Sequence, residues 1–233
     1  MKTILAVTAA LIGMLITVPE ASARFQVRCF SSHVATVDPI VSPGETSAHQ
    51  HEFFGNRSTD KDSTYRSMRL GSTNCSTSAD TAGYWTPTVL RPGGGLVRGK
   101  SLLIYYRTTS QTVAFPRNLR VISDDFRVGP NPQNLIIQFP QCWDGVHRDS
   151  PDHRSHMTFK RGGGCPASHP VEVPFVTEVF RYPVNVSGLT LSSGPLSTGH
   201  ADFWNTWDQA QLVRLVARCA DIDCGRIDDR EAA

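Results

Sequence analysis

Leu102–Arg107 (LLIYYR) and Thr177–Tyr182 (TEVFRY) are short runs of aromatic, β-branched and other apolar residues, the composition that favours β-strands. Turn-forming sequences such as Arg91–Gly95 (RPGGG) and Gly129–Pro132 (GPNP) interrupt the chain between runs of this kind. The pattern predicts a mainly β fold. Further strands are expected at Thr112–Phe115, Leu119–Ile122, Leu135–Phe139, Met157–Lys160 and Val171–Val173.

One helix is predicted near the C-terminus, over Trp207–Cys219, where apolar residues recur at helical spacing. Asn205 or Thr206 is the expected N-cap, with Asp208 in the first turn. Together with the β-rich remainder, this helix predicts a single sandwich or jelly-roll-like domain that has irregular loops and is braced by disulfides. The helical spacing is carried by Leu212, Leu215, Val216 and Cys219.

The N-terminus has the pattern of a secretory signal peptide. Lys2 supplies a positive charge, Ile4–Val18 is an apolar run, and Ala21–Ala23 (ASA) is the small-residue pattern that signal peptidase cleaves. Residues 1–23 are therefore expected to be removed, leaving residues 24–233 as one secreted, extracellular domain. No later stretch approaches the roughly 20 apolar residues that span a bilayer, so no membrane partner is expected after cleavage.

Charge and cysteine content narrow the class of protein further. The net charge is only +2 and no run of Lys or Arg occurs, so nucleic acid is not an expected partner. An even number of cysteines, six, in an exported chain predicts three disulfides. Pairing by proximity along the chain gives Cys29–Cys75, Cys142–Cys165 and Cys219–Cys224.

Histidine clusters are the most informative chemical feature. Five of the eight histidines fall in polar, turn-like segments: His49 and His51, His153 and His156, and His200. Residues two apart in a strand, or three apart in a helical turn, point to one side, so each pair can converge. Imidazole is a common zinc and copper ligand and also a proton shuttle near neutral pH. The sequence leaves an acid–base site, a metal site and structural hydrogen bonding open.

Carboxylates and aromatic rings complete the candidate site. Asp202, two residues after His200, is a candidate base or orienting group, whereas Asp38 before Pro39 is expected to cap a turn. Tyr84, Trp85 and Trp143 are candidates for a substrate-binding groove, because aromatic rings stack on the apolar faces of sugars.

Several familiar enzyme motifs are missing. His51-Glu52 begins an H-E-x-x-H pattern, but Gly55 stands where its second histidine would be. The chain has no G-x-S-x-G nucleophile elbow and no phosphate-binding glycine loop, which excludes the usual serine hydrolases and nucleotide enzymes.

Seven phrases occur in a recognisable order along most of the chain: Val37–Gly44 (VDPIVSPG), His49–Gly55 (HQHEFFG), Tyr84–Pro87 (YWTP), Phe139–Gly145 (FPQCWDG), Asp152–His156 (DHRSH), Cys165–Pro170 (CPASHP) and Gly199–Phe203 (GHADF). Together they resemble a family of secreted fungal and bacterial proteins catalogued as a domain of unknown function (number nineteen ninety-six). The resemblance implies a single exported domain and brings no activity with it. The chain departs from that family at Ser78, where a further cysteine is frequent.

Three functions remain as hypotheses. The first is an extracellular hydrolase or lyase acting on a polysaccharide, with catalytic His49, His51, His153, His156, His200 and Asp202. The second is a copper- or zinc-binding protein that uses His49, His51, His153 and His156 as ligands. The third is a non-catalytic carbohydrate-binding module.

Overall fold

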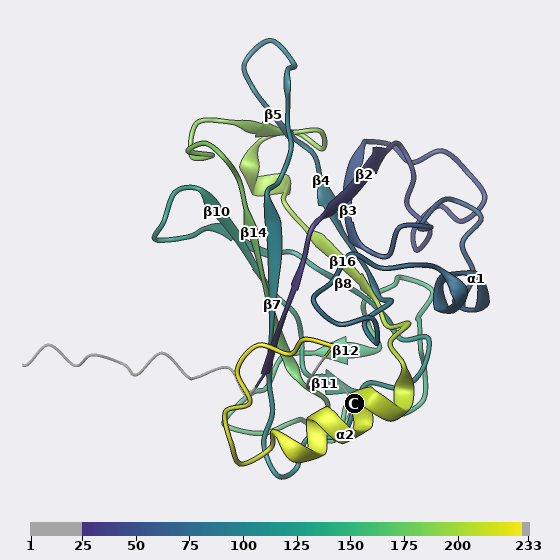
Figure 1. The fold of residues 1–233 in the computed structure, drawn as a ribbon. Coiled ribbons are helices and arrows are strands. Elements are labelled where there is room, and N and C mark those ends of the chain that lie inside the picture. Colours follow the sequence, from purple (N-terminus) through teal and green to yellow (C-terminus); the bar gives the residue numbers. More distant parts are fainter. Residues whose placement is uncertain (1–24, 230–233) are drawn as a thin grey trace, which may run out of the picture.

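Two five-stranded antiparallel sheets form the body of the protein (Figure 1), as described for residues 25–229 by the computed structural model. The predicted signal peptide, residues 1–23, lies outside these described residues. The strand order of the first sheet is β1-β7-β14-β10-β9. Its strands are β1 (Phe25–Cys29), β7 (Ser101–Arg107), β14 (Phe175–Arg181), β10 (Asn134–Gln138) and β9 (Asp125–Val128).

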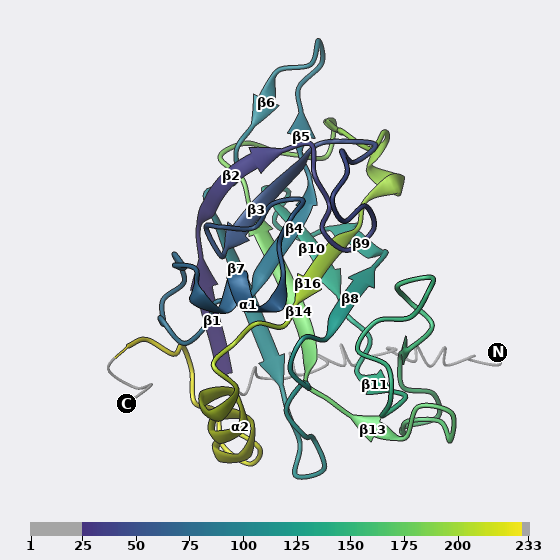
Figure 2. The same ribbon diagram turned by 90° about the vertical axis from the view of Figure 1, so that its right-hand side faces the viewer.

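The second sheet has the order β2-β3-β4-β16-β8, and Figure 2 shows its strands side by side. A short helix, α1 (Tyr65–Leu70), lies in the segment between β3 and β4. The strands are β2 (Ser31–Ala35), β3 (His51–Gly55), β4 (Gly83–Pro87), β16 (Ala201–Trp204) and β8 (Arg120–Ser123).

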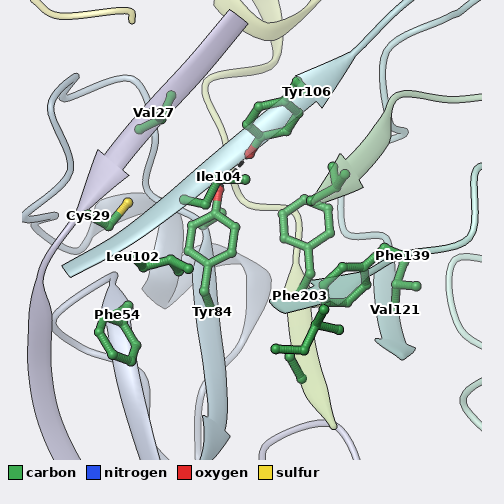
Figure 3. Close-up of a cluster of buried hydrophobic side chains, with 14 of the residues drawn as sticks. Val27, Cys29, Phe54, Tyr84, Leu102, Ile104, Tyr106, Val121, Phe139 and Phe203 are labelled. Atoms are coloured by element: carbon green, nitrogen blue, oxygen red, sulfur yellow. Dashed lines mark hydrogen bonds between the residues drawn. The ribbon is translucent and has the colours of Figure 1, made fainter. Parts of the chain in front are cut away.

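The main core lies between the two sheets, as a sandwich requires (Figure 3). Successive side chains of a strand point to opposite faces, so every second residue enters this core. The Tyr84 hydroxyl on β4 meets the Tyr106 hydroxyl on β7 at 2.7 Å, and the rings of Phe54 and Phe180 pack at 5.1 Å. These contacts join the sheets face to face, which confirms the predicted mainly β sandwich.

A second, smaller apolar cluster lies on the outer face of the second sheet. Phe53, Trp85 and Trp204 contribute rings from three adjacent strands, and Ile40 and Met68 cover them from the segments before and after β3. The second sheet is therefore buried on both faces. This cover matters for function, because it encloses the end of the sheet where His51 and Asp202 lie.

Two three-stranded sheets lie at the periphery. One has the order β12-β11-β13 and the other β15-β5-β6. Gly93 and Gly94, both with φ near +90°, form the turn between β5 and β6, as the glycine run predicts. The bounds are β12 (Met157–Thr158), β11 (Cys142–Trp143), β13 (Val171–Glu172), β15 (Thr190–Leu191), β5 (Val89–Leu90) and β6 (Leu96–Val97), with a 3-10 turn at Leu196–Thr198.

The predicted C-terminal helix is present as α2 (Gln209–Arg218). Its N-cap is Asp208, whose carboxylate accepts the backbone N–H of Gln211 at 3.0 Å. The expectation that Asn205 or Thr206 caps it was wrong, because both are buried in contacts with other segments: Asn205 donates to the Pro116 carbonyl, and Thr206 to that of Thr81.

The three predicted disulfides, Cys29–Cys75, Cys142–Cys165 and Cys219–Cys224, are all present. Three disulfides are typical of extracellular proteins. Within residues 25–229, none of the helices has the length and apolar character needed to cross a membrane.

One predicted strand is absent. Thr112–Phe115 is irregular: the Thr112 hydroxyl accepts the Thr109 backbone N–H to close a turn. Further along, the Phe115 carbonyl accepts a hydrogen bond from the Gln209 side chain rather than from a neighbouring strand. Tertiary contacts thus replace the ladder that its composition favours.

Candidate metal centre

Three imidazoles converge at one end of the second sheet. His51 is the first residue of β3, His49 lies just before it, and His200 immediately precedes β16. The Nε2 atom of His200 is 3.3 Å from Nε2 of His49 and 3.4 Å from Nε2 of His51. Strand β4 separates β3 from β16 and pairs with both, so the sheet register brings His200 next to residues 149 and 151 positions earlier in the sequence.

Backbone carbonyls fix the orientation of two of these rings. His51 donates from Nδ1 to the Val37 carbonyl at 2.9 Å, and His200 donates from Nδ1 to the Thr198 carbonyl at 3.1 Å. A neutral ring that carries its proton on Nδ1 has a bare lone pair on Nε2. The two bare Nε2 atoms therefore face each other with no proton of their own between them. Metal-binding histidines characteristically donate their other N–H in this way.

Electrostatics keep the cluster uncharged. Burial, and then the neighbouring His49 and His200, lowers the pKa of His51 to about 3. Burial is also the largest cause that lowers the pKa values of His49 and His200. Neutral imidazole is the form that binds metal ions, so the site favours the ligand form at neutral pH.

Two buried carboxylates border the histidines. Asp38 uses Oδ1 to accept the backbone N–H groups of Ile40 and Val41, and its Oδ2 lies 3.9 Å from Nε2 of His51. Asp202 is fully buried, and neither of its oxygens has a hydrogen-bond partner among the described residues. Burial, reinforced by Asp38, raises the pKa of Asp202 well above its usual value. Asp38, His51 and Asp202 each place one ligand atom within 4.8 Å of the others.

A cavity of about 220 Å³ opens beside this cluster. Its lining includes His49, His200 and both carboxylates, whereas His51 is fully buried and does not line it. Arg154 also lines it and pairs with Asp124 at 2.7 Å. The cluster thus has a closed side, made by the sheet, and an open side that a small ligand can reach.

The second predicted histidine pair does not join the cluster. Both ring nitrogens of His156 are used, one with the Ser150 hydroxyl at 2.8 Å and the other with the Arg120 carbonyl at 2.7 Å. His153 binds the carboxylate of Asp149 through Nδ1 at 2.8 Å. These contacts hold both histidines away from the cluster, so the structure brings together three of the five predicted histidines, His49, His51 and His200.

Two of the three predicted substrate-binding residues are buried. Tyr84 and Trp85 are 0 % exposed, Tyr84 in the main core and Trp85 in the smaller cluster, so neither offers a ring face to a sugar. Trp143 is half-buried against the main core, and its Nε1 donates to the His147 carbonyl at 2.6 Å.

Two site residues were missed from the sequence. Asp38 does cap a turn, as expected, but its second oxygen faces His51. Arg154 lies between the two histidines of the DHRSH phrase and is the member of that phrase that lines the cavity. The sequence did indicate that the DHRSH phrase is functionally relevant, but nothing in the phrase distinguishes Arg154 from its neighbours.

Comparison with known proteins agrees with the resemblance noted in the sequence. No curated protein and no solved structure matches the chain significantly. The family model described as "Domain of unknown function (DUF1996)" matches residues 38–134 and 126–207. The matched residues include the three clustered histidines together with Asp38 and Asp202, and they make up most of the chain. The chain therefore belongs to the DUF1996 family.

Proposed function

We propose that this chain is an extracellular zinc-binding protein in which His49, His51 and His200 hold the ion through their Nε2 atoms. The observation that carries the proposal is the convergence of three ring nitrogens, two of which have their lone pairs exposed by Nδ1–H bonds to backbone carbonyls. Bare lone pairs 3.4 Å apart repel each other unless a cation lies between them.

The spacing of the nitrogens favours zinc over copper. Ligands about 2.05 Å from a tetrahedral zinc ion lie about 3.3 Å from one another. Ligands around a square-planar Cu(II) ion at a similar bond length would lie about 2.8 Å apart when adjacent and about 4 Å apart when opposite. The two separations in the structure, 3.3 and 3.4 Å, agree with the tetrahedral value.

Three protein ligands and an open position are the arrangement of catalytic zinc sites, whereas structural sites are closed by four. The cavity lies on the open side of the histidines, with Asp202 and Arg154 in its lining. Zinc in such a site supplies a Lewis acid and lowers the pKa of a bound water. This arrangement supports hydrolysis of an extracellular substrate, and a polysaccharide is the class that we propose.

The metal is tested first by elemental analysis of the untagged protein, stripped with a chelator and reloaded separately with zinc and with copper. We expect about one zinc per chain. His200→Ala should lower zinc affinity at least ten-fold, because it removes the nitrogen that contacts both other rings.

The matched control is His147→Ala, which removes an exposed histidine that pairs with Asp144 away from the cluster. It should keep full zinc content. Circular dichroism of both variants establishes that they are folded. Zinc binding by folded His200→Ala at the affinity of the unaltered protein would refute the proposed ligand set.

A further inference from the structure

The outward face of the first sheet carries an excess of positive charge. Antiparallel register places opposed residues on the same face, so Arg28, Leu103, Val179, Ile136 and Arg127 form one row across all five strands. Arg181 and Arg107 stand on β14 and β7, in rows on either side of it. The face thus has four arginines, and its one carboxylate is Asp125 on the edge strand β9.

These arginines span the width of the sheet. Arg28 lies on one edge strand and Arg127 on the other, so their Cα atoms are four strand spacings, about 19 Å, apart. Neighbouring strands in between carry Arg107 and Arg181. The positive charge is therefore spread over a length that fits several units of a polymer rather than one small anion.

Most of this charge is not neutralised within the described residues. Only Arg127 has an acidic partner, Asp125 at 3.6 Å, and no ion pair is found for Arg28, Arg107 or Arg181 in residues 25–229. The Nε atoms of Arg28 and Arg107 are buried and lack a hydrogen-bond partner in the same residues.

Arg107 is held in place for such an acceptor. Its guanidinium carbon lies 4.4 Å from the centre of the Phe175 ring, and one terminal nitrogen donates to the Thr177 hydroxyl at 2.9 Å. Burial and then the nearby Arg127 lower the pKa of Arg107, because the two cations are close enough to repel each other. A guanidinium that is already ordered loses little entropy when it binds a carboxylate with two hydrogen bonds.

Neutral groups between the arginines suit a sugar polymer. A single row carries Gln26, Tyr105, Thr177 and Gln138, whose amides and hydroxyls both donate and accept hydrogen bonds. Two of the three aliphatic side chains in the arginine row, Leu103 and Val179, are only 3 % and 9 % exposed, and the third, Ile136, is half-buried. None of the large apolar side chains on these five strands is fully exposed, which does not favour insertion into a lipid layer.

We propose that this face, defined by Arg28, Arg107, Arg127 and Arg181, binds an acidic polysaccharide whose carboxylates pair with the arginines. The surface is separate from the histidine cluster, which is on the outer side of the other sheet, so it does not depend on a bound metal. A binding face of this kind would hold the protein on an acidic extracellular matrix.

The test measures binding of the purified protein to polygalacturonate and to the same polymer after methyl esterification, which removes the charge and keeps the sugar. A chelator is present throughout, so that metal bound by the polymer or by the histidines has no part in the result. We expect binding to polygalacturonate that weakens as salt increases, and at least ten-fold weaker binding to the ester.

Arg127→Gln combined with Arg181→Gln removes two exposed charges of the face and should weaken binding at least ten-fold. Arg66→Gln combined with Arg91→Gln is the matched control, because both residues are exposed, lie outside this sheet and change the net charge equally. Equal loss in both double variants would overturn the proposal. Equal affinity for the ester, or tighter binding to DNA or to anionic vesicles than to polygalacturonate, would do the same.

Discussion

Asp202 is expected to lower the stability of the metal-free protein and to favour the binding of a metal ion. A buried carboxylate without hydrogen bonds is unfavourable in the metal-free protein, whereas a neighbouring cation would make it favourable. Asp202→Asn removes the ionisable group with little change in shape. We expect a higher unfolding temperature in the presence of a chelator and at least ten-fold weaker zinc binding, measured by competition with a chromophoric chelator. Unchanged zinc affinity would show that this carboxylate takes no part in the centre.

The burial of His156 makes the stability of the folded protein depend on pH. Burial is the largest cause that lowers its pKa, and the ring is 1 % exposed. Because the pKa is lower in the folded protein than the usual value near 6.5, the unfolded chain binds more protons below pH about 6.5, and folding stability falls as the pH drops. In His156→Gln, the amide can keep contacts with Arg120 and Ser150 without titrating.

The variant should therefore lose less stability than the unaltered protein between pH 6.5 and pH 5, by at most about 1.4 kcal/mol per pH unit. Urea denaturation at several pH values measures this slope, and the comparison at pH 8, where neither side chain is charged, gives the packing cost of the substitution. Parallel pH dependence in the two proteins would contradict this assignment.

The sequence predicts which kinds of side chain form the candidate site better than it predicts which individual histidines belong to it. His49, His51, His200 and Asp202 were all expected from their polar, histidine-rich phrases, and the fold brings them together. His153 and His156 have equally suggestive spacing. What excludes His156 is its contact with the Arg120 carbonyl of β8, and such a distant partner leaves no trace in the local sequence.

The helix α2 has one face packed on the main core and an opposite face exposed to solvent. Leu212, Leu215 and Val216 face the main core, and Val213 on the opposite side is 49 % exposed. Leu212→Ala should lower the free energy of unfolding by about 2–5 kcal/mol, since it leaves a cavity in a packed core. Val213→Ala is the control, with an expected change within about 0.5 kcal/mol. Similar urea midpoints for the two variants would mean that the helix contributes little to the core.

Elements were predicted where their own composition determines them. The strands β7, β10 and β14 are long apolar runs at the centre of the first sheet, and α2 has a clear helical period. Strands β3, β4 and β16 were missed because their residues are buried on both faces, so apolar and polar side chains do not alternate. These three strands carry or flank the clustered histidines.

The whole molecule depends on covalent cross-links as well as on its cores. The three disulfides close loops of very different length, with sequence separations of 46, 23 and 5 residues. In the loop-entropy model, their removal costs about 4, 3 and 2 kcal/mol, in that order, because a longer loop restricts the unfolded chain more.

The three cysteine pairs are similarly buried, so the stability costs of removing them can be compared directly. Each consists of one buried cysteine, Cys29, Cys142 or Cys219, and one half-buried partner. Replacing each pair by alanine therefore removes a similar amount of packing, and differences in the free energy of unfolding report mainly on loop length. Urea denaturation followed by circular dichroism should rank the variants with Cys29–Cys75 as the most costly loss and Cys219–Cys224 as the least. The reverse order would show that local strain or packing, rather than restriction of the unfolded chain, determines what these bonds contribute.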